Sequence, residues 1–193
     1  MKIIIRAVRS RKHIVDEMLK EIPNAIVYYD DFYKDTMKSF LHVLEMNGSD
    51  PVVILEDDVE LTSNFLEKLK SALIGHEHEL VQFFSMRKED IDVGSRYDRN
   101  YLMGQCTYFP QGYTKMIRDY YELWKNTPNG IKYYTGTDTM INDFLRYIDK
   151  KYWIYVPSLV QHLEVKSVID SRRSSKRQSK TFIKKGEIKW LKI

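Results

Sequence analysis

The stretch Pro51–Leu61 reads P-V-V-I-L-E-D-D-V-E-L. Its four consecutive apolar residues, Val52–Leu55, are too few for a helix and too apolar for an exposed strand, so they predict a buried strand of the parallel type. Three carboxylates follow at once, those of Glu56, Asp57 and Asp58. Adjacent negative charges where a strand leaves the core are costly unless a cation or hydrogen-bond donors neutralise them. Because open α/β sheets bind ligands at the carboxyl ends of their strands, the stretch predicts a ligand-binding edge.

The carboxylate triplet has two interpretations. If the pleat of the strand continues, Glu56 and Asp58 share one face and Asp57 points away from them. Two carboxylates on one face suit a hard divalent cation that also binds substrate phosphates. Alternatively, the acidic residues lead into the N-terminus of a helix, whose dipole favours Glu60 and its neighbours. The triplet alone does not choose between these interpretations, so the rest of the chain must decide.

Apolar periodicity around this strand predicts alternating strands and helices. Two further strands are expected at Lys2–Val8 and Ala25–Tyr29. The intervening and following segments carry apolar stripes at helical spacing, within 14–22, 37–44 and 65–73. Strand and helix thus alternate three times in about 75 residues, which is typical of an α/β sheet with right-handed crossovers. We expect a Rossmann-type mixed sheet, mostly parallel and flanked by helices.

The second half of the chain is less regular. Strands are expected within Leu80–Met86, Tyr101–Phe109 and Tyr152–Val156. Helices are expected near Gln111–Lys125 and after a cap at Thr137 or Asp138. A polar loop is expected at Arg87–Asn100 and a turn at Pro128–Gly130. These elements add strands and helices to the same predicted sheet.

Composition points to one globular domain. The chain has 193 residues, of which 43% are hydrophobic, and its one cysteine, Cys106, excludes a disulfide framework. No stretch approaches the roughly 20 apolar residues of a membrane span, and the opening residues are too few for a signal-peptide core. We therefore expect a cytoplasmic protein.

Charge is distributed unevenly along the chain. Residues 166–193 contain ten Lys and Arg against Asp170 and Glu187, a net charge of +8, whereas the whole chain carries +4. We expect a domain at 1–165 and a basic C-terminal tail at 166–193 that contacts a polyanion, with DNA favoured over an anionic membrane surface. The alternative is a solvated terminus without a partner.

Four segments together resemble a known enzyme family. I-L-E-D-D-V-E-L at Ile54–Leu61 is similar to the metal-binding acidic motif of GT-A fold glycosyltransferases, above all the lipooligosaccharide-biosynthesis and collagen galactosyltransferase-like family. Val8–Met18 resembles the basic stretch after the first strand of that family. Tyr101–Phe109, with Gly104 and Tyr108, resembles the strand on its acceptor side, and P-S-L-V-Q-H at Pro157–His162 resembles its closing segment. The likeness covers about residues 1–165 and implies a GT-A-like fold.

The resemblance implies a metal site that holds a nucleotide-sugar donor. Asp58 would be the principal metal ligand, Glu56 would assist it or bind the ribose, and His162 would be the third protein ligand. Carboxylate and imidazole ligands together favour Mn²⁺ over Mg²⁺, although both suit the site. Taken alone, His162 has the alternative of a structural histidine.

Further residues are expected to bind the donor. Arg6, Arg9 and Arg11 follow or end the first strand, near the place of a diphosphate, and guanidinium groups pair well with phosphate. Asp57 belongs to the same donor-binding set, and Asp30, next to Asp31 at the end of the second strand, would receive the base or ribose, as the fold implies. The alternatives are a solvent-facing basic segment for Arg11 and a helix cap for Asp30.

Catalysis and acceptor binding are assigned to the second half. An inverting transfer needs a carboxylate base, and Asp138 in G-T-D-T-M is the candidate that the fold implies, with helix capping as its alternative. A retaining transfer needs no such base, so the stereochemistry stays open. Tyr133 and Tyr134, beside Gly136, are candidates for stacking on an acceptor.

The leading hypothesis is a metal-dependent glycosyltransferase of the hexosyltransferase type, which uses a UDP-sugar. The acceptor is expected to be a hydroxylated base in DNA, as in phage-type DNA glycosylation, which would place a phage-encoded enzyme in the host cytoplasm. The alternatives are transfer to a lipid-linked or cell-surface glycan, and a non-catalytic nucleic-acid-binding protein. A nucleotidyltransferase is a further rival, but the chain has no Gly-rich phosphate loop.

Overall fold

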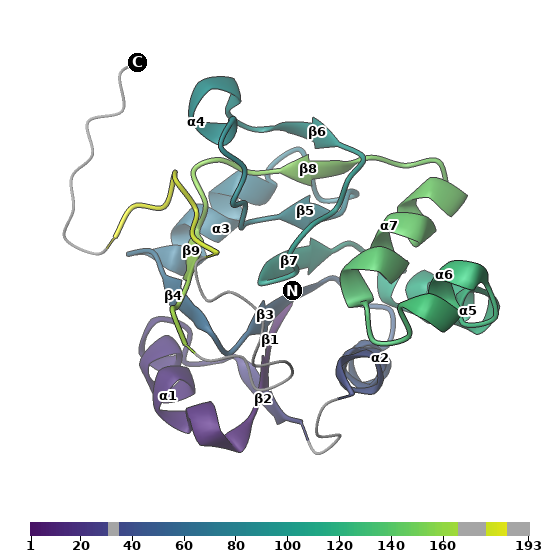
Figure 1. Ribbon diagram of the computed structural model, residues 1–193. Coiled ribbons are helices and arrows are strands. Elements are labelled where there is room, and N and C mark those ends of the chain that lie inside the picture. The colour runs from purple at the N-terminus through teal and green to yellow at the C-terminus, as the bar shows by residue number, and fades with distance from the viewer. Residues whose placement is uncertain (31–34, 166–176, 185–193) are drawn as a thin grey trace.

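The computed structural model of the protein describes residues 1–30, 35–165 and 177–184. A seven-stranded sheet lies at its centre, in the order β2-β1-β3-β7-β5-β8-β6 (Figure 1). These strands are β2 (Ile26–Tyr29), β1 (Lys2–Ala7), β3 (Val52–Glu56), β7 (Cys106–Phe109), β5 (Val81–Gln82), β8 (Tyr152–Ile154) and β6 (Arg96–Asp98). β7 and β6 run against the other five strands. The predicted mixed sheet, mostly parallel and flanked by helices, is confirmed.

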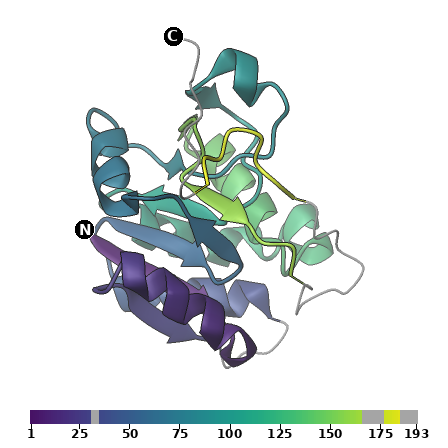
Figure 2. The same ribbon diagram turned by 90° about the vertical axis from the view of Figure 1, so that its left-hand side faces the viewer.

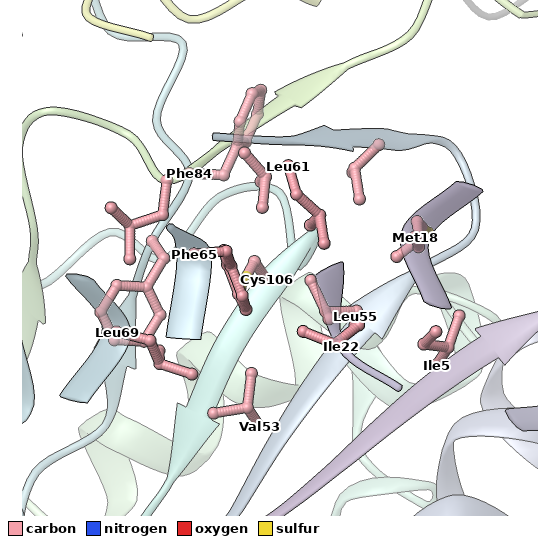
Figure 3. Packing of buried hydrophobic residues seen from close by; sticks show 14 of the residues in the cluster. Ile5, Met18, Ile22, Val53, Leu55, Leu61, Phe65, Leu69, Phe84 and Cys106 are labelled. Carbon is pink, nitrogen blue, oxygen red and sulfur yellow. The ribbon is translucent and has the colours of Figure 1, made fainter. Parts of the chain in front are cut away.

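Helices cover both faces of the sheet, which explains the unbroken apolar run in β3. Val53 and Leu55 pack into the cluster shown in Figure 3, while Val52 and Ile54 pack on the opposite face. The first face is covered by α1 (Lys12–Glu21) and α3 (Phe65–Leu73), and the second by α2 (Thr36–Asn47), α5 (Tyr113–Trp124) and α7 (Thr137–Tyr147). Because successive side chains of a strand point to opposite faces, a strand buried on both sides needs apolar residues at every position.

A small second sheet was not expected. After the acidic triplet, the chain forms β4 (Val59–Leu61), which pairs antiparallel with β9 (Val160–His162) before α3 begins. Val59 and Leu61 are buried while Glu60 between them is not, so β4 has the alternation of a half-buried strand. The interpretation of Glu60 as part of a helix N-terminus is therefore wrong.

Two segments predicted to be irregular contain regular structure. The stretch 87–100 forms α4 (Asp90–Val93) and β6, because its charges pair with one another: the Arg96 Nη1 donates to the buried Asp90 Oδ1 at 2.7 Å. The predicted turn at 128–130 is the start of α6 (Pro128–Lys132), where the Thr127 hydroxyl caps the Gly130 N–H. A short 3₁₀ helix, η1 (Arg9–Arg11), precedes α1.

The described part of the C-terminal tail, residues 177–184, lies along β9 (Figures 1 and 2). The remainder of the predicted tail, 166–176 and 185–193, lies outside the described residues, as does Asp31. The division into a domain at 1–165 and a tail at 166–193 stays a prediction. Among the helices of the described residues, none is long and apolar enough to cross a bilayer.

Candidate functional site

A cleft of about 690 Å³ opens at the carboxyl ends of β1 and β3. Five of the residues predicted to bind the donor or a metal or to catalyse the reaction line it, although they come from distant parts of the sequence: Arg6, Glu56, Asp58, Asp138 and His162. The structure thus places predicted donor-binding, metal-binding and catalytic residues around one space.

Arg6 and Glu56 meet because of the register of the sheet. β1 and β3 are parallel neighbours in which Arg6 pairs with Glu56, so both side chains lie on the same face. The Arg6 Nη2 donates to Glu56 Oε1 at 2.7 Å, and its Nε donates to both carboxylate oxygens at 3.1 and 3.2 Å. Burial alone would lower the pKa of Arg6, but the charge and hydrogen bonds of Glu56, with the charges of Asp30 and Asp57, together outweigh burial, and the pKa lies above its usual value. For Glu56, burial raises the pKa and the ion pair with Arg6 opposes that rise.

Asp57 and Arg11 form a buried ion pair behind the cleft. The Arg11 Nη1 donates to Asp57 Oδ1 at 2.7 Å, and the Val8 N–H donates to Asp57 Oδ2 at 2.7 Å. Neither side chain lines the cleft. Burial raises the pKa of Asp57, and the hydrogen bond from Val8 and the charge of Arg11 oppose that rise. These residues fasten the end of β3 to the start of η1, and the expected contact of Arg11 and Asp57 with the donor stays a prediction.

Asp58 and His162 are brought together by the small sheet. The β4–β9 register pairs Val59 with His162, and the Leu163 N–H donates to the Asp58 carbonyl at 2.8 Å. This places Asp58 Oδ2 at 3.6 Å from His162 Nε2 and at 3.1 Å from Arg11 Nη1. Burial would raise the pKa of Asp58, but His162 and Arg11 outweigh burial and the pKa lies below its usual value. Asp58 is therefore ionised at neutral pH.

Two polar atoms of this pair have no partner. Asp58 Oδ1 and His162 Nδ1 are buried and accept or donate no hydrogen bond within the described part of the chain. Most buried polar atoms in folded proteins are hydrogen-bonded, so such exceptions need an explanation. The 3.6 Å between Oδ2 and Nε2 is too long for a hydrogen bond. Oδ2 and Nε2 are not the two unpartnered atoms, and Oδ2 also accepts from Arg11, but their separation is close to the roughly 3–3.5 Å between two atoms that bind one cation at bond lengths of about 2.1 Å.

The carboxylate of Asp58 and the imidazole of His162 fit a divalent cation that has two protein ligands. The described residues contain no group of three or more His, Cys, Asp or Glu side chains arranged to hold a metal ion. Glu56, the expected additional ligand, is not added to the pair because Arg6 engages both its oxygens. A cation here would take its other ligands from substrate phosphates and water, as Mg²⁺ commonly does in proteins.

The opposite wall of the cleft comes from α6, α7 and the segment before β7. Tyr133 and Tyr134 lie at this wall, and Tyr134 is 69% exposed. Asp138 Oδ2 accepts from the Met103 N–H at 2.9 Å, so Asp138 holds the segment that contains Gly104. A side chain at Gly104 would lie 3.1 Å from the Tyr101 hydroxyl, which is tighter than ordinary van der Waals contact. Asp138 is not the residue before the helix: that place belongs to Gly136.

Three expected site residues lie elsewhere. Arg9 is exposed and its guanidinium lies over the Tyr29 ring, 5.4 Å from the centroid. Asp30 follows β2, where its N–H donates to the Ala7 carbonyl, and it does not line the cleft. Tyr108 is buried in the core, and its hydroxyl donates to the Glu77 carbonyl at 2.8 Å. Tyr108 therefore does not line the cleft, whereas Gly104 of the same segment does.

Two basic residues of the cleft were not predicted as site residues. Lys132 lines it from α6, and Arg177 lines it from the described part of the tail. Neither lies in a motif, and both follow stretches without clear periodicity. No signal in the sequence connects them with the strand ends.

Comparisons with known proteins give a fold-level likeness. No protein-family model matches the chain, and no curated protein matches it. Among solved structures, the chain is similar to A197 from STIV, at 14% identity over 98% of each chain with a TM-score of 0.48. It is also similar to a UDP-glucose pyrophosphorylase, at 11% identity over 80% of this chain and 72% of the other, with a TM-score of 0.44. A putative glucose-1-phosphate thymidylyltransferase from Bacillus anthracis follows, at 11% identity, 78% and 68% coverage and a TM-score of 0.40. These values carry no argument about family or function.

Proposed function

We propose that the protein is a metal-dependent glycosyltransferase, which moves a sugar from a nucleotide-sugar donor to an acceptor hydroxyl. The observation that supports this most strongly is the pair Asp58 and His162. Both line the cleft, and each keeps a buried polar atom without a partner among the described residues. An acidic motif at the end of a buried strand, in a cleft large enough for a nucleotide, agrees with that reaction.

Asp58 and His162 would hold the cation, and Arg6 would lie beside the diphosphate. A divalent cation supplies Lewis-acid stabilisation to a leaving diphosphate. Glu56 fixes the Arg6 guanidinium in one orientation through three contacts, and a fixed guanidinium is suited to phosphate. The proposed donor is a UDP-sugar.

Asp138 is the proposed base of an inverting transfer. In that reaction the bond from the sugar C1 to the phosphate oxygen breaks, and its electron pair leaves with the nucleoside diphosphate. The acceptor oxygen forms the new bond to C1 and passes its proton to the carboxylate of Asp138. The hydrogen bond from Met103 holds that carboxylate at the cleft wall. In a retaining transfer, the same contact would make Asp138 a positioning residue only.

The proposed acceptor is a hydroxylated base in DNA. The wall formed by α6, α7 and the segment before β7 would face the acceptor. It carries the exposed ring of Tyr134, and the Lys132 ammonium lies 4.9 Å from the centroid of the Tyr133 ring. Bases stack on aromatic side chains, and cations pair with the phosphate backbone. DNA binding that weakens steeply with salt would support this acceptor. Sugar transfer to a lipid-linked glycan would show that the acceptor is a glycan and not DNA.

The test is calorimetric titration of Mn²⁺ and a panel of UDP-sugars into the wild type and Asp58→Asn. We expect nucleotide-sugar binding that needs Mn²⁺ and is lost in Asp58→Asn. Asp16→Asn is the matched control, because it removes an exposed carboxylate of α1 whose ion pair among the described residues is with Lys12. The absence of metal-dependent binding in the wild type, or an Asp58→Asn variant that binds like the wild type, would refute the proposal.

A further inference from the structure

The described part of the tail is fastened to the domain by specific hydrogen bonds. Gln161 of β9 accepts from the Ser179 N–H at 2.8 Å, and its amide donates to the Ser179 carbonyl at 3.2 Å. The Ser179 hydroxyl donates to the Ser158 hydroxyl at 2.8 Å, and both side chains are buried. These contacts hold the tail in one register along β9.

Further contacts continue on both sides of Ser179. The Thr62 hydroxyl donates to the Ile183 carbonyl at 3.2 Å, and the Phe182 side chain is buried. Gln178 donates to Glu164 at 3.0 Å. A segment held by a buried ring and by paired side-chain and backbone hydrogen bonds is part of the domain, whatever its basic composition. Figure 2 shows this segment beside β9.

Docking places Arg177 in the cleft. Arg177 is the first described residue of the segment, and it lines the cleft together with His162 and Val165. Its Nη1 lies 3.7 Å from the Met103 sulfur, which is a weak acceptor. Within the described part of the chain, no carboxylate forms an ion pair with Arg177. Its charge is therefore not balanced by the acidic residues of the cleft.

The charges of the two arginines next to the acidic triplet are already balanced by carboxylates, so that Arg6 would lie beside the diphosphate without adding net positive charge to the site. Arg6 is bound by Glu56, and Arg11 is bound by Asp57 and Asp58. Lys132 lies on the far wall, over the Tyr133 ring. A diphosphate carries two to three negative charges, and one divalent cation does not balance three. In the part of the chain that the structure describes, Arg177 is a cation of the cleft that forms no ion pair with a carboxylate.

We propose that Arg177 binds phosphate oxygens of the donor's diphosphate, so that residues 177–184 form part of the donor site. This inference rests on the proposed function, since it concerns the same nucleotide. A guanidinium suits this role because it keeps its charge and presents several donors to phosphate oxygens. One residue of the basic tail, Arg177, then binds the nucleotide-sugar donor, in addition to any contact of the tail with a polyanion.

The experiment compares UDP and UMP binding in the presence of MnCl₂. Both nucleotides are titrated calorimetrically into the full-length wild type, Arg177→Gln, Arg177→Lys and Lys180→Gln. Lys180→Gln is the matched control, because it removes the same charge from an exposed side chain of the same segment that does not line the cleft. We expect Arg177→Gln to weaken UDP binding on the order of 10- to 100-fold. UMP binding changes less, Arg177→Lys loses only part of the affinity, and Lys180→Gln binds like the wild type.

Each other outcome overturns a defined statement. If the wild type binds UDP and Arg177→Gln binds it equally well, the role of Arg177 is refuted and the proposed function stands. An equal loss for UMP and UDP would refute a contact with the second phosphate. If Lys180→Gln loses as much as Arg177→Gln, the effect is general electrostatics. If the wild type binds none of a panel of nucleoside diphosphates, the proposed function fails, and this inference fails with it.

Discussion

Removal of the Arg11 guanidinium is expected to destabilise the protein, and the size of this destabilisation is expected to depend on pH. The side chains of Arg11 and Asp57 are only 9% and 6% exposed, and the Arg11 Nη1 lies 2.7 Å from Asp57 and 3.1 Å from Asp58. Loss of one partner of a buried ion pair leaves an uncompensated charge, at a cost of about 3–5 kcal/mol. In the variant, Asp57 keeps the hydrogen bond from the Val8 N–H. We therefore expect Arg11→Met to lower the free energy of unfolding by about 3 kcal/mol, the lower end of this range.

The sign of the pH effect follows from Asp57. Burial raises the pKa of Asp57, and Arg11 opposes the rise, so the pKa rises further without Arg11. A carboxyl group whose folded-state pKa lies above its unfolded-state value takes up its proton first in the folded state, which gains stability as the pH falls. The cost of Arg11→Met should therefore shrink between about pH 8 and about pH 5.

Urea denaturation with EDTA present measures both effects. The control is Lys12→Met, which removes a cation from an exposed ion pair one position further along and should change stability little. Asp57→Asn in the Arg11→Met background should recover part of the loss, because the two substitutions act on one contact. The reasoning is contradicted if the cost is the same at both pH values or if the two substitutions are additive.

Two predictions concern the contact between α5 and α6 and the described part of the tail. Gly130→Ala should destabilise the protein by more than about 2 kcal/mol, because the new Cβ would overlap the Trp124 carbonyl. Replacing Gly by Ala inside a helix normally stabilises the helix. A variant that is more stable than the wild type in urea denaturation would therefore show that the steric argument is wrong. Gln161→Ala removes both hydrogen bonds to the Ser179 backbone, so trypsin should cleave after Lys180 faster than in the wild type. An unchanged cleavage rate would show that these bonds do not hold the segment.

The sequence predicted what local patterns determine. The apolar run of β3 and the carboxylates after it are adjacent in the chain, so their place at a buried strand end followed directly. Glu56 and Asp58 line the cleft and Asp57 does not. However, β3 ends at Glu56 and residues 57–58 form a turn, so the continued pleat on which the prediction of a shared face depended is absent. The partners of these carboxylates depend on strand register, which the sequence does not display.

The rest depends on contacts between distant residues. β4 and β9 have three residues each, too few for a visible period, so the structure that joins Asp58 to His162 had no signal of its own. The predicted loop at 87–100 was misread because its charges looked solvated, whereas Arg96 pairs with the buried Asp90. Arg177 lies in a Ser-, Arg- and Lys-rich stretch, where composition suggests a solvated tail and hides the docking contacts of Ser179.

The central claim is that Asp58 and His162 bind a divalent cation that carries the donor diphosphate. Crystals soaked with MnCl₂ and UDP-sugars test it directly through the anomalous signal of manganese. The account predicts one manganese peak within bonding distance of an Asp58 carboxylate oxygen and a His162 ring nitrogen, with diphosphate oxygens on its open side. A nucleotide bound in the cleft without manganese at Asp58 and His162, or a manganese peak at other residues, would contradict it.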